Sequence, residues 1–219
     1  MYKAKRNWEN INIAAYDGAG EYEFPRMEPC RECDVDQWIA FKYAKMLPAE
    51  QRGRTGIHFF IDDYQFLRVW REPNAYIPLL RQFGAVMSPD FSVYTEFPKA
   101  MRIWNFYRNA WCGKYWQDNG INVIPNATWA GRESYAYCFD GLPEESIVGA
   151  SSYGTMRTRE GIDFFVNGLN AMIKKVSPKK VYVYGRFPKD RVLRPERIEE
   201  IETRIDMIRK LYMEKKKGV

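Results

Sequence analysis

The segment AVMSPDFSVY, residues 85–94, indicates the fold of this chain better than any other stretch. Three apolar residues, Ala85–Met87, are followed within a few positions by a proline, an acid, two hydroxyls and a phenol. A short apolar run that ends in polar side chains is typical of a buried parallel strand whose carboxyl end opens onto a binding site. The same pattern recurs on either side of this segment.

Further short apolar runs occur at GIHFFI (56–61), INVIP (121–125), SIVGA (146–150) and KKVYVYG (179–185). Helical segments separate them, at 74–84, 97–120 and 161–176. Apolar runs that alternate with helices are typical of parallel strands joined by crossover helices. The sequence predicts an α/β fold with a mostly parallel sheet of five to six strands. An open doubly wound sheet and an incomplete (β/α) barrel both give this alternation.

The chain divides into three predicted parts. Residues 57–194 form the α/β core domain, and residues 1–56 form an N-terminal extension packed on it, with a helix at 34–47. Residues 195–219 predict a long amphipathic helix, because isoleucines recur from Ile198 at three- and four-residue spacing. A stripe of this kind packs on its own domain or forms the seam of a homodimer.

Composition restricts the function classes. The 219 residues carry a net charge of +6 and are 16% aromatic, which favours a nucleic-acid or nucleotide partner over a membrane. No apolar stretch reaches membrane-spanning length, and the first ten residues lack the apolar core of a signal peptide. With four cysteines the chain is not a disulfide scaffold, and we expect it in a bacterial cytoplasm.

Polar residues follow every apolar run, and they form the predicted site. Asp90 is the expected catalytic base or nucleophile, with Asp63 as its partner. The expected substrate-binding residues are Ser92, Tyr94, Asn126, Trp129, Ser151 and Arg186. Two facing carboxylates can exchange protons or bind a divalent cation, so the cofactor stays open between none and a divalent ion. For any single one of these residues, capping of the next helix is the favoured explanation, and it is the whole set that indicates a site.

Other candidate residues carry less weight. His58 lies inside an apolar run and is expected in the core. The pair Cys30 and Cys33 forms a lone CxxC without a second pair, which disfavours a zinc site. On the helix at 97–120 we expect Trp104 and its neighbours to face the sheet, and Asn105 and its neighbours to face outward. No run is followed by a Walker A or GxGxxG phosphate loop.

The segments FFIDDYQF, SPDFSVYTEFPKAMRIWNFYRNAWCGKYWQDNGINVIPNATW and VYVYG resemble an uncharacterised family of phages and bacteria, mainly Firmicutes, catalogued as domain of unknown function 4417. The resemblance covers most of residues 20–186 and implies a phage or mobile-element setting, but no established activity. The positions that match its motifs include Asp63, Asp90, Ser92, Asn105, Arg108, Trp116, Pro125, Trp129 and Gly185.

Two hypotheses about function therefore remain open. In the first, the protein acts on or binds a nucleic acid or nucleotide at the carboxyl ends of its strands, with carboxylate chemistry at Asp90. In the second, it is a non-catalytic phage-encoded binder that captures a nucleotide or blocks a host protein. The sequence does not decide whether the protein is an enzyme.

Overall fold

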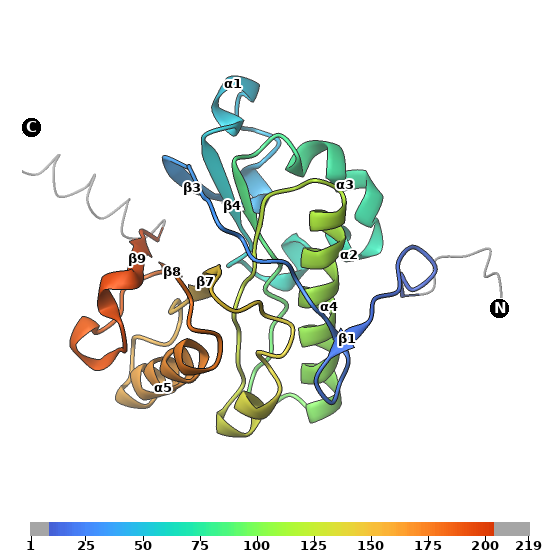
Figure 1. Ribbon diagram of the computed structural model, residues 1–219. Helices are drawn as coiled ribbons and strands as arrows, with labels where there is room; N and C mark the ends of the chain where they lie inside the picture. Colours follow the sequence, from blue (N-terminus) through green and yellow to red (C-terminus); the bar gives the residue numbers. More distant parts are fainter. Residues whose placement is uncertain (1–8, 204–219) are drawn as a thin grey trace, which may run out of the picture.

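The computed structural model of the chain describes residues 9–203, and seven parallel strands form its centre (Figure 1). Four of them form one sheet in the order β3-β4-β5-β6, and three form a second sheet in the order β7-β8-β9. Their bounds are β3 Gln37–Ala40, β4 Thr55–His58, β5 Ala85–Met87, β6 Val123–Ile124, β7 Ile147–Ser151, β8 Lys180–Tyr184 and β9 Ile198–Ile201.

A parallel bridge between Asn126 and Gly149 links the two sheets just beyond the end of β6. The Gly149 N–H donates to the Pro125 carbonyl at 2.9 Å, and the Ala127 N–H donates to the Gly149 carbonyl at 2.8 Å. The strands therefore follow one another in space in chain order, from β3 to β9. A doubly wound sheet reverses its strand order at a switch point, whereas chain order is the order found in (β/α) barrels.

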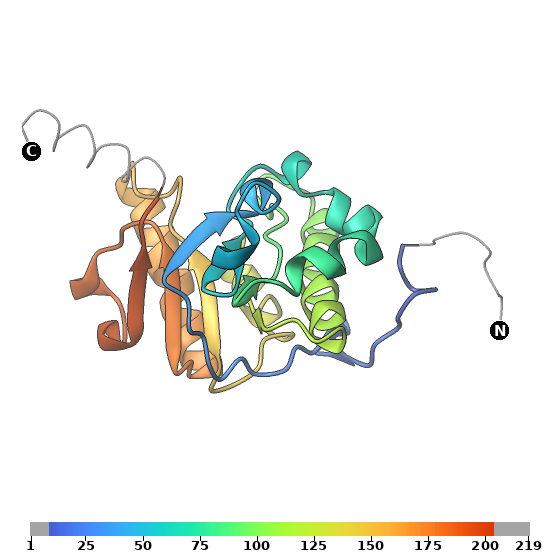
Figure 2. The same ribbon diagram turned by 90° about the horizontal axis from the view of Figure 1, so that it is seen from above.

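Contacts across the strands show that the sheet is strongly curved. Trp38 on β3 and Tyr182 on β8 have ring centroids 5.2 Å apart, although four strands lie between theirs. In a flat sheet that separation would be roughly 24 Å, at about 4.8 Å per strand. His58 on β4 likewise lies 4.5 Å from Tyr184 on β8, centroid to centroid. Side chains on the inner face thus form an enclosed cluster, and Figure 2 shows the strands from above.

Helices and short turns connect the strands and cover their outer face. The α-helices are α1 Ala49–Arg52, α2 Arg68–Arg71, α3 Pro73–Leu80, α4 Lys99–Asp118 and α5 Arg159–Val176. The 3₁₀ turns are η1 Phe41–Tyr43, η2 Asp63–Gln65, η3 Arg132–Ala136, η4 Lys189–Arg191 and η5 Pro195–Arg197. In Figure 1, α2, α3 and α4 lie on the side of β4, and α5 lies on the side of β7 and β8. Among the described residues, no helix has the length and apolarity needed to cross a bilayer.

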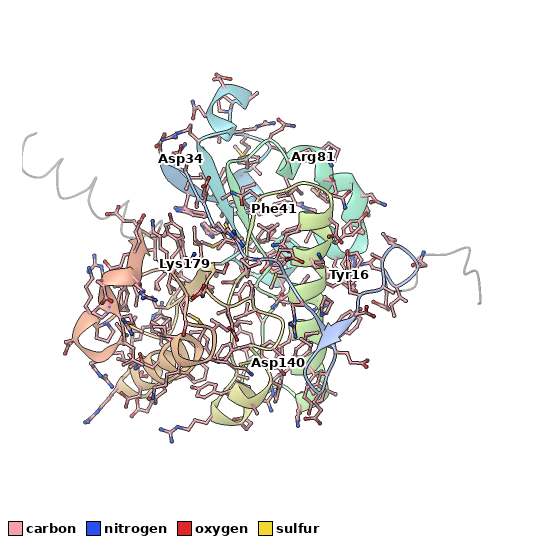
Figure 3. The ribbon with its side chains drawn as sticks, in the orientation of Figure 1. Tyr16, Asp34, Phe41, Arg81, Asp140 and Lys179 are labelled. Carbon is pink, nitrogen blue, oxygen red and sulfur yellow. The ribbon has the colours of Figure 1, made fainter. Side chains whose placement is uncertain are left out.

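The N-terminal arm lies against α4 (Figure 1). A short antiparallel pair, β1 Gly18–Ala19 and β2 Phe24–Pro25, contacts the helix. The Trp111 indole N–H of α4 donates to the Ala14 carbonyl at 3.0 Å. Met27 packs against Gly113, where an added Cβ would lie 2.4 Å from the Met27 sulfur. The arm and the middle of α4 are therefore closely packed, and Figure 3 shows the side chains between them.

Three predictions about secondary structure need correction. The helix expected at 34–47 is wrong, because Gln37–Ala40 forms strand β3 and pairs with β4, so the parallel sheet begins inside the predicted N-terminal extension. Within residues 9–203 there are seven parallel strands, in a four-stranded and a three-stranded sheet, rather than five or six. The predicted C-terminal helix begins instead with η5 and strand β9, and its remainder from residue 204 lies outside the described residues.

The predicted faces of α4 are also reversed in part. Asn105, Asn109 and Trp116 are buried, whereas Trp104 is 38% exposed. The reason lies in the loop before the helix, whose backbone needs hydrogen-bond partners inside the fold, as described next.

Candidate functional site

The carboxyl ends of the parallel strands lie along one edge of the curved sheet, which we call the carboxyl edge. Because the strands are consecutive in space, the polar residues that follow them are neighbours. The carboxyl edge comprises residues 59–64 after β4, 88–94 after β5, 125–129 after β6, 151–155 from the last residue of β7 onward, and 185–187 after β8.

Asp90 is the acid at the centre of this edge. The Asn126 side-chain amide donates to its Oδ1 at 3.1 Å, and the Thr128 hydroxyl is a second hydrogen-bond partner. Asp90 keeps part of its surface open to solvent but has protein on most sides. Burial, and then the nearby Asp63 carboxylate, raise the pKa of Asp90 to about 7, against the two hydrogen bonds, which lower it. A carboxyl group with a pKa near neutrality can both give and accept a proton.

Asn126 connects the ends of three strands. Its backbone N–H donates to the Ser88 hydroxyl oxygen at 2.8 Å, and its side chain lies beside Gly149 on β7. Asn126 is 5% exposed, and its Oδ1 accepts no hydrogen bond within the described residues. Buried polar atoms are nearly always paired, so this acceptor is an unusual feature next to Asp90.

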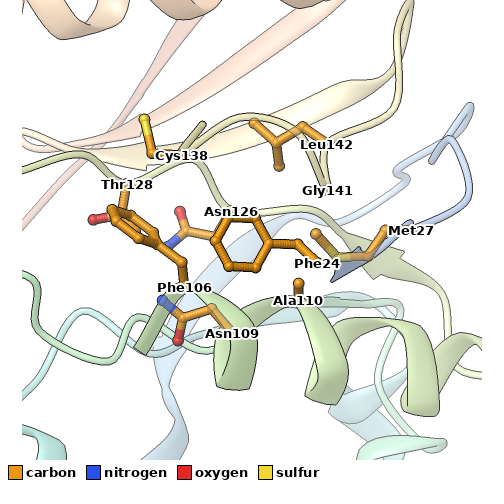
Figure 4. Close-up of a pocket in the computed structure, with 10 residues that line it drawn as sticks. All are labelled: Phe24, Met27, Phe106, Asn109, Ala110, Asn126, Thr128, Cys138, Gly141 and Leu142. Atoms are coloured by element: carbon orange, nitrogen blue, oxygen red, sulfur yellow. The ribbon is translucent and has the colours of Figure 1, made fainter. Parts of the chain in front are cut away.

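A small cavity lies between α4, the N-terminal arm and the end of β6 (Figure 4). Its volume is about 20 Å³, and its polar lining comes from Asn109, Asn126 and Thr128. A space of this size admits about one water molecule. The cavity is therefore too small for a substrate, and any ligand of this site must approach from the open side of the carboxyl edge.

Asp63 positions the loop that carries Asp90. The Ser92 hydroxyl donates to Asp63 Oδ1 at 2.8 Å, and the Ser92 backbone N–H donates to both carboxylate oxygens at 3.1–3.2 Å. Both oxygens of the Asp63 carboxylate therefore accept hydrogen bonds from Ser92. Asp62 is exposed and accepts a hydrogen bond from the Gln65 side chain at 3.0 Å.

Helix α4 fixes the same loop from the outside. The Asn109 carboxamide oxygen accepts from the Phe91 N–H at 2.8 Å, and the Asn105 carboxamide donates to the Ser92 carbonyl. The Arg108 guanidinium lies 3.8 Å from the centroid of the Phe91 ring, which is fully buried. The polar loop that follows β5 is therefore hydrogen-bonded to Asp63 on one side and to α4 on the other.

The structure places the remaining predicted residues in different surroundings. Tyr94 is 61% exposed, and the Ser151 hydroxyl accepts from the Tyr153 N–H at 3.2 Å. Arg186 is exposed, and its carbonyl accepts from the Ser152 hydroxyl at 2.7 Å. All of these positions belong to the carboxyl edge.

Trp129 needs correction as a residue that stacks on a base. It is 6% exposed, and its ring packs on Phe139 and Phe165. Gly168 on α5 lies directly over the indole, where an added Cβ would be 2.1 Å from it. The ring therefore has no free face, and Trp129 is a core residue.

Two exposed tyrosines were not among the predicted site residues. Tyr64 is 79% exposed and Tyr153 is 53% exposed, and both belong to the carboxyl edge. Each directly follows a polar residue at a strand end, which is the signal that could have identified them. Together with Tyr94 they place three phenol rings at this edge.

The lone histidine and the cysteine pair take structural positions. His58 is 4% exposed, its Nδ1 accepts from the Phe60 N–H at 3.3 Å, and burial lowers its pKa to about 3. The prediction of a core histidine is confirmed. Cys30 is buried, and burial raises the pKa of its thiol to about 12. Within residues 9–203 no three His, Cys, Asp or Glu side chains are grouped as a metal site would require.

Comparisons with known proteins identify the family. The Gene 1 protein of Mycobacterium phage L5 is 36% identical over 176 residues, which are 78% of this chain and 75% of the phage protein. The Gene 1 protein of Mycobacterium phage D29 is 38% identical over 174 residues, 78% of this chain but only 63% of that protein. No solved structure matches the chain. The sequence profile described as "Domain of unknown function (DUF4417)" matches residues 16–199, and the chain belongs to this family.

Proposed function

We propose that this protein binds a nucleic acid or nucleotide at the carboxyl edge and uses Asp90 there as a proton donor or acceptor. The observation that supports the proposal best is the position of Asp90. The Asp90 carboxylate accepts hydrogen bonds from an amide and a hydroxyl, and part of its surface is still open to solvent. The loop that carries Asp90 is held by hydrogen bonds to Asp63 on one side and to α4 on the other. A positioned acid whose pKa is near the working pH is what general acid–base chemistry requires.

The other edge residues fit this proposal by their chemistry. Arg186 supplies a positive charge for a phosphate, and the Ser151 hydroxyl supplies a donor. The exposed rings of Tyr64, Tyr94 and Tyr153 take the stacking role that Trp129 cannot fill. The fold that we propose for the site is an incomplete (β/α) barrel, in which ligands bind at the carboxyl ends of the strands.

A non-catalytic binder is the second candidate, and the exposed tyrosines favour it. Exposed apolar surface that gathers in one region is typical of a binding site, and these three tyrosines are exposed along one edge. In this case the rings and Arg186 contribute most of the affinity for a nucleotide or a host protein, and Asp90 contributes little. The two candidate functions therefore differ in which substitutions should abolish activity or weaken binding.

A thermal-shift screen followed by turnover assays tests the proposal. Wild-type protein, Asp90→Asn and Tyr94→Ala are each heated with nucleotides or with oligonucleotides, with and without divalent ions. A ligand at 100 times its Kd adds about 2.7 kcal/mol, or roughly 5–11 °C in Tm for a domain of this size. We expect wild type and Asp90→Asn to shift alike, with turnover lost only in Asp90→Asn. Binding that Tyr94→Ala weakens, without product from wild type, would support the binder instead, and no shift with any ligand would refute both nucleotide hypotheses.

A further inference from the structure

A second surface with unused charge lies on the outside of the fold, between η3 and α5. It is an open groove of about 370 Å³, within the range of about 300–1,000 Å³ found for ligand sites. In Figure 1, α5 lies beside the yellow segment that contains η3, and the two elements are in contact. The residues that line the groove are Arg132, Tyr135, Asn167, Asn170, Ala171 and Lys174.

One face of α5 forms the wall of this groove. Asn167, Asn170, Ala171 and Lys174 are three or four residues apart, so they lie on the same side of the helix. The Asn170 side chain is already engaged, since it donates to the Arg191 carbonyl at 3.1 Å and accepts from the Leu193 N–H at 2.7 Å. Asn167 is exposed and adds an amide to the groove.

The charge of the groove is positive and unpaired. Arg132 and Lys174 are exposed, and neither makes an ion pair or a side-chain hydrogen bond with any residue from 9 to 203. Among the residues that the structure describes, no acidic side chain lines the groove.

The acids nearest to the groove in the chain are already neutralised. Glu133, which follows Arg132 in the chain, forms an ion pair with Arg102 at 2.5 Å. Asp140 forms an ion pair at 2.5 Å with Lys175, which follows Lys174 in the chain. Asp163, one turn before Asn167 on α5, pairs with Arg191 at 2.5 Å. The two free cations of the groove therefore keep their full charge for an anionic partner.

Tyr135 adds a partly exposed ring to the same lining, and this ring stacks on Phe139 at a centroid distance of 6.1 Å. Cations beside a partly exposed ring match a nucleic-acid strand whose phosphates are charged and whose bases are free to stack. In a duplex the base faces are hidden, and an isolated nucleotide would favour an enclosed pocket over an open groove. This combination points to single-stranded nucleic acid.

We propose that the groove between η3 and α5 binds the phosphate backbone of a single-stranded nucleic acid through Arg132 and Lys174. This proposal goes beyond the proposed function, because the groove lies outside the carboxyl edge and shares none of its residues. The groove would contact the phosphates of a nucleic-acid strand, and phosphate contacts contribute affinity without sequence specificity.

Fluorescence anisotropy with a labelled single-stranded oligonucleotide of 15 nucleotides tests the proposal. The groove variant is Arg132→Glu with Lys174→Glu. The matched control is Arg31→Glu with Lys179→Glu, which makes the same charge change at exposed positions near the amino ends of β7 and β8, outside the groove lining. We expect the groove variant to bind at least about tenfold more weakly, and the control to change Kd by less than about threefold. The slope of log K against log salt should fall by about 1.4 in the groove variant, at about 0.7 per phosphate contact.

Several outcomes would overturn the proposal. They are equal losses in the groove and control variants, an unchanged salt slope, tighter binding of a duplex of equal length, and no binding by wild type. The neutral variant Arg132→Gln with Lys174→Gln should weaken binding less than charge reversal does, and its thermal unfolding reports that the fold is intact. Failure of the proposed function gives a different result from failure of this proposal. If only the proposed function is wrong, Tyr94→Ala leaves oligonucleotide binding unchanged and Asp90→Asn leaves turnover unchanged, while the groove variant still loses affinity.

Discussion

Replacing Asp90 by asparagine should stabilise the protein at alkaline pH. Burial and the Asp63 carboxylate raise the pKa of Asp90 from 3.8 to about 7 in the folded state. The unfolded chain ionises this carboxyl near its ordinary pKa, so between about pH 4 and pH 7 the folded state binds more protons. Stability therefore falls as pH rises through this window, and the full cost of the charge is present above pH 7.

The size of this effect follows from the shift. At about 1.36 kcal/mol per unit, a rise of about three units corresponds to roughly 4 kcal/mol. Because part of the Asp90 side chain is open to solvent, we expect about half of this, roughly 2 kcal/mol. The neutral asparagine keeps an oxygen that can accept from the Asn126 amide, and it removes the charge. At pH 8.5 the gain equals about 4–8 °C in Tm, and near pH 4 it should vanish.

Urea unfolding of wild type and Asp90→Asn at pH 4.5, 6.5 and 8.5 measures this difference. The matched control is Asp62→Asn, since Asp62 is exposed on the same edge and its Gln65 hydrogen bond survives the change. We expect the control to differ from wild type by less than about 0.5 kcal/mol at every pH. An Asp90→Asn gain that is the same at pH 4.5 and pH 8.5, or a loss at pH 8.5, would refute the assignment of Asp90 as a partly buried acid with a raised pKa.

Three further predictions concern a residue that holds the Asp90 loop and two positions in the core beside the site. Asp63→Ala should destabilise the protein by about 1–3 kcal/mol in urea unfolding, because it leaves the Ser92 N–H without an acceptor. Gly168→Ala should cost at least about 2 kcal/mol, because the new methyl group would lie 2.1 Å from the Trp129 indole, and loss of near-ultraviolet ellipticity should accompany it. His58 should show no titration in its NMR ring signals between pH 4.5 and pH 8, because its pKa is lowered to about 3.

Each of these predictions has a comparison that isolates its cause. Ser92→Ala keeps the backbone N–H bond to Asp63 and should cost less than Asp63→Ala, at about 0.5–1.5 kcal/mol. Gly53→Ala adds a methyl group where nothing lies within 4 Å, so it should be near neutral. A His58 signal that titrates near pH 6.5 would contradict its burial.

The strands of the fold were predictable from the sequence because of their pattern. Each of the five apolar runs overlaps a parallel strand, since a strand buried on both faces needs continuous apolar residues. Strand β3 was missed because QWIAFKY has apolar residues at helical spacing, and only pairing with β4 selects the extended form. Strand β9 was missed for the same reason, since its burial pattern of two exposed residues between Ile198 and Ile201 also fits a helix.

The candidate site was predictable in its location but not in its details. Parallel strands bring their carboxyl ends together whatever the side chains are, so the rule that identified Asp90 and Asn126 needed no contacts. The separate roles of Asp63 and Asp90 depend on which carboxylate Ser92 reaches, and that is set by a loop 29 residues away from Asp63 in the chain. The burial of Trp129 depends on Gly168, almost 40 residues later, which no local pattern reveals.

The buried polar face of α4 bears on whether the site is functional or only a set of caps. A loop that needs only to connect β5 to α4 can satisfy its backbone with water at the surface. Here Asn105 and Asn109 are buried to bond the loop backbone, although burying an amide is costly unless every bond is made. Capping does not require this arrangement, because Asp90 precedes α4 by nine residues and the helix has no side-chain cap. Precise placement of one acid does require it, since catalytic and binding groups act only when their supports are rigid.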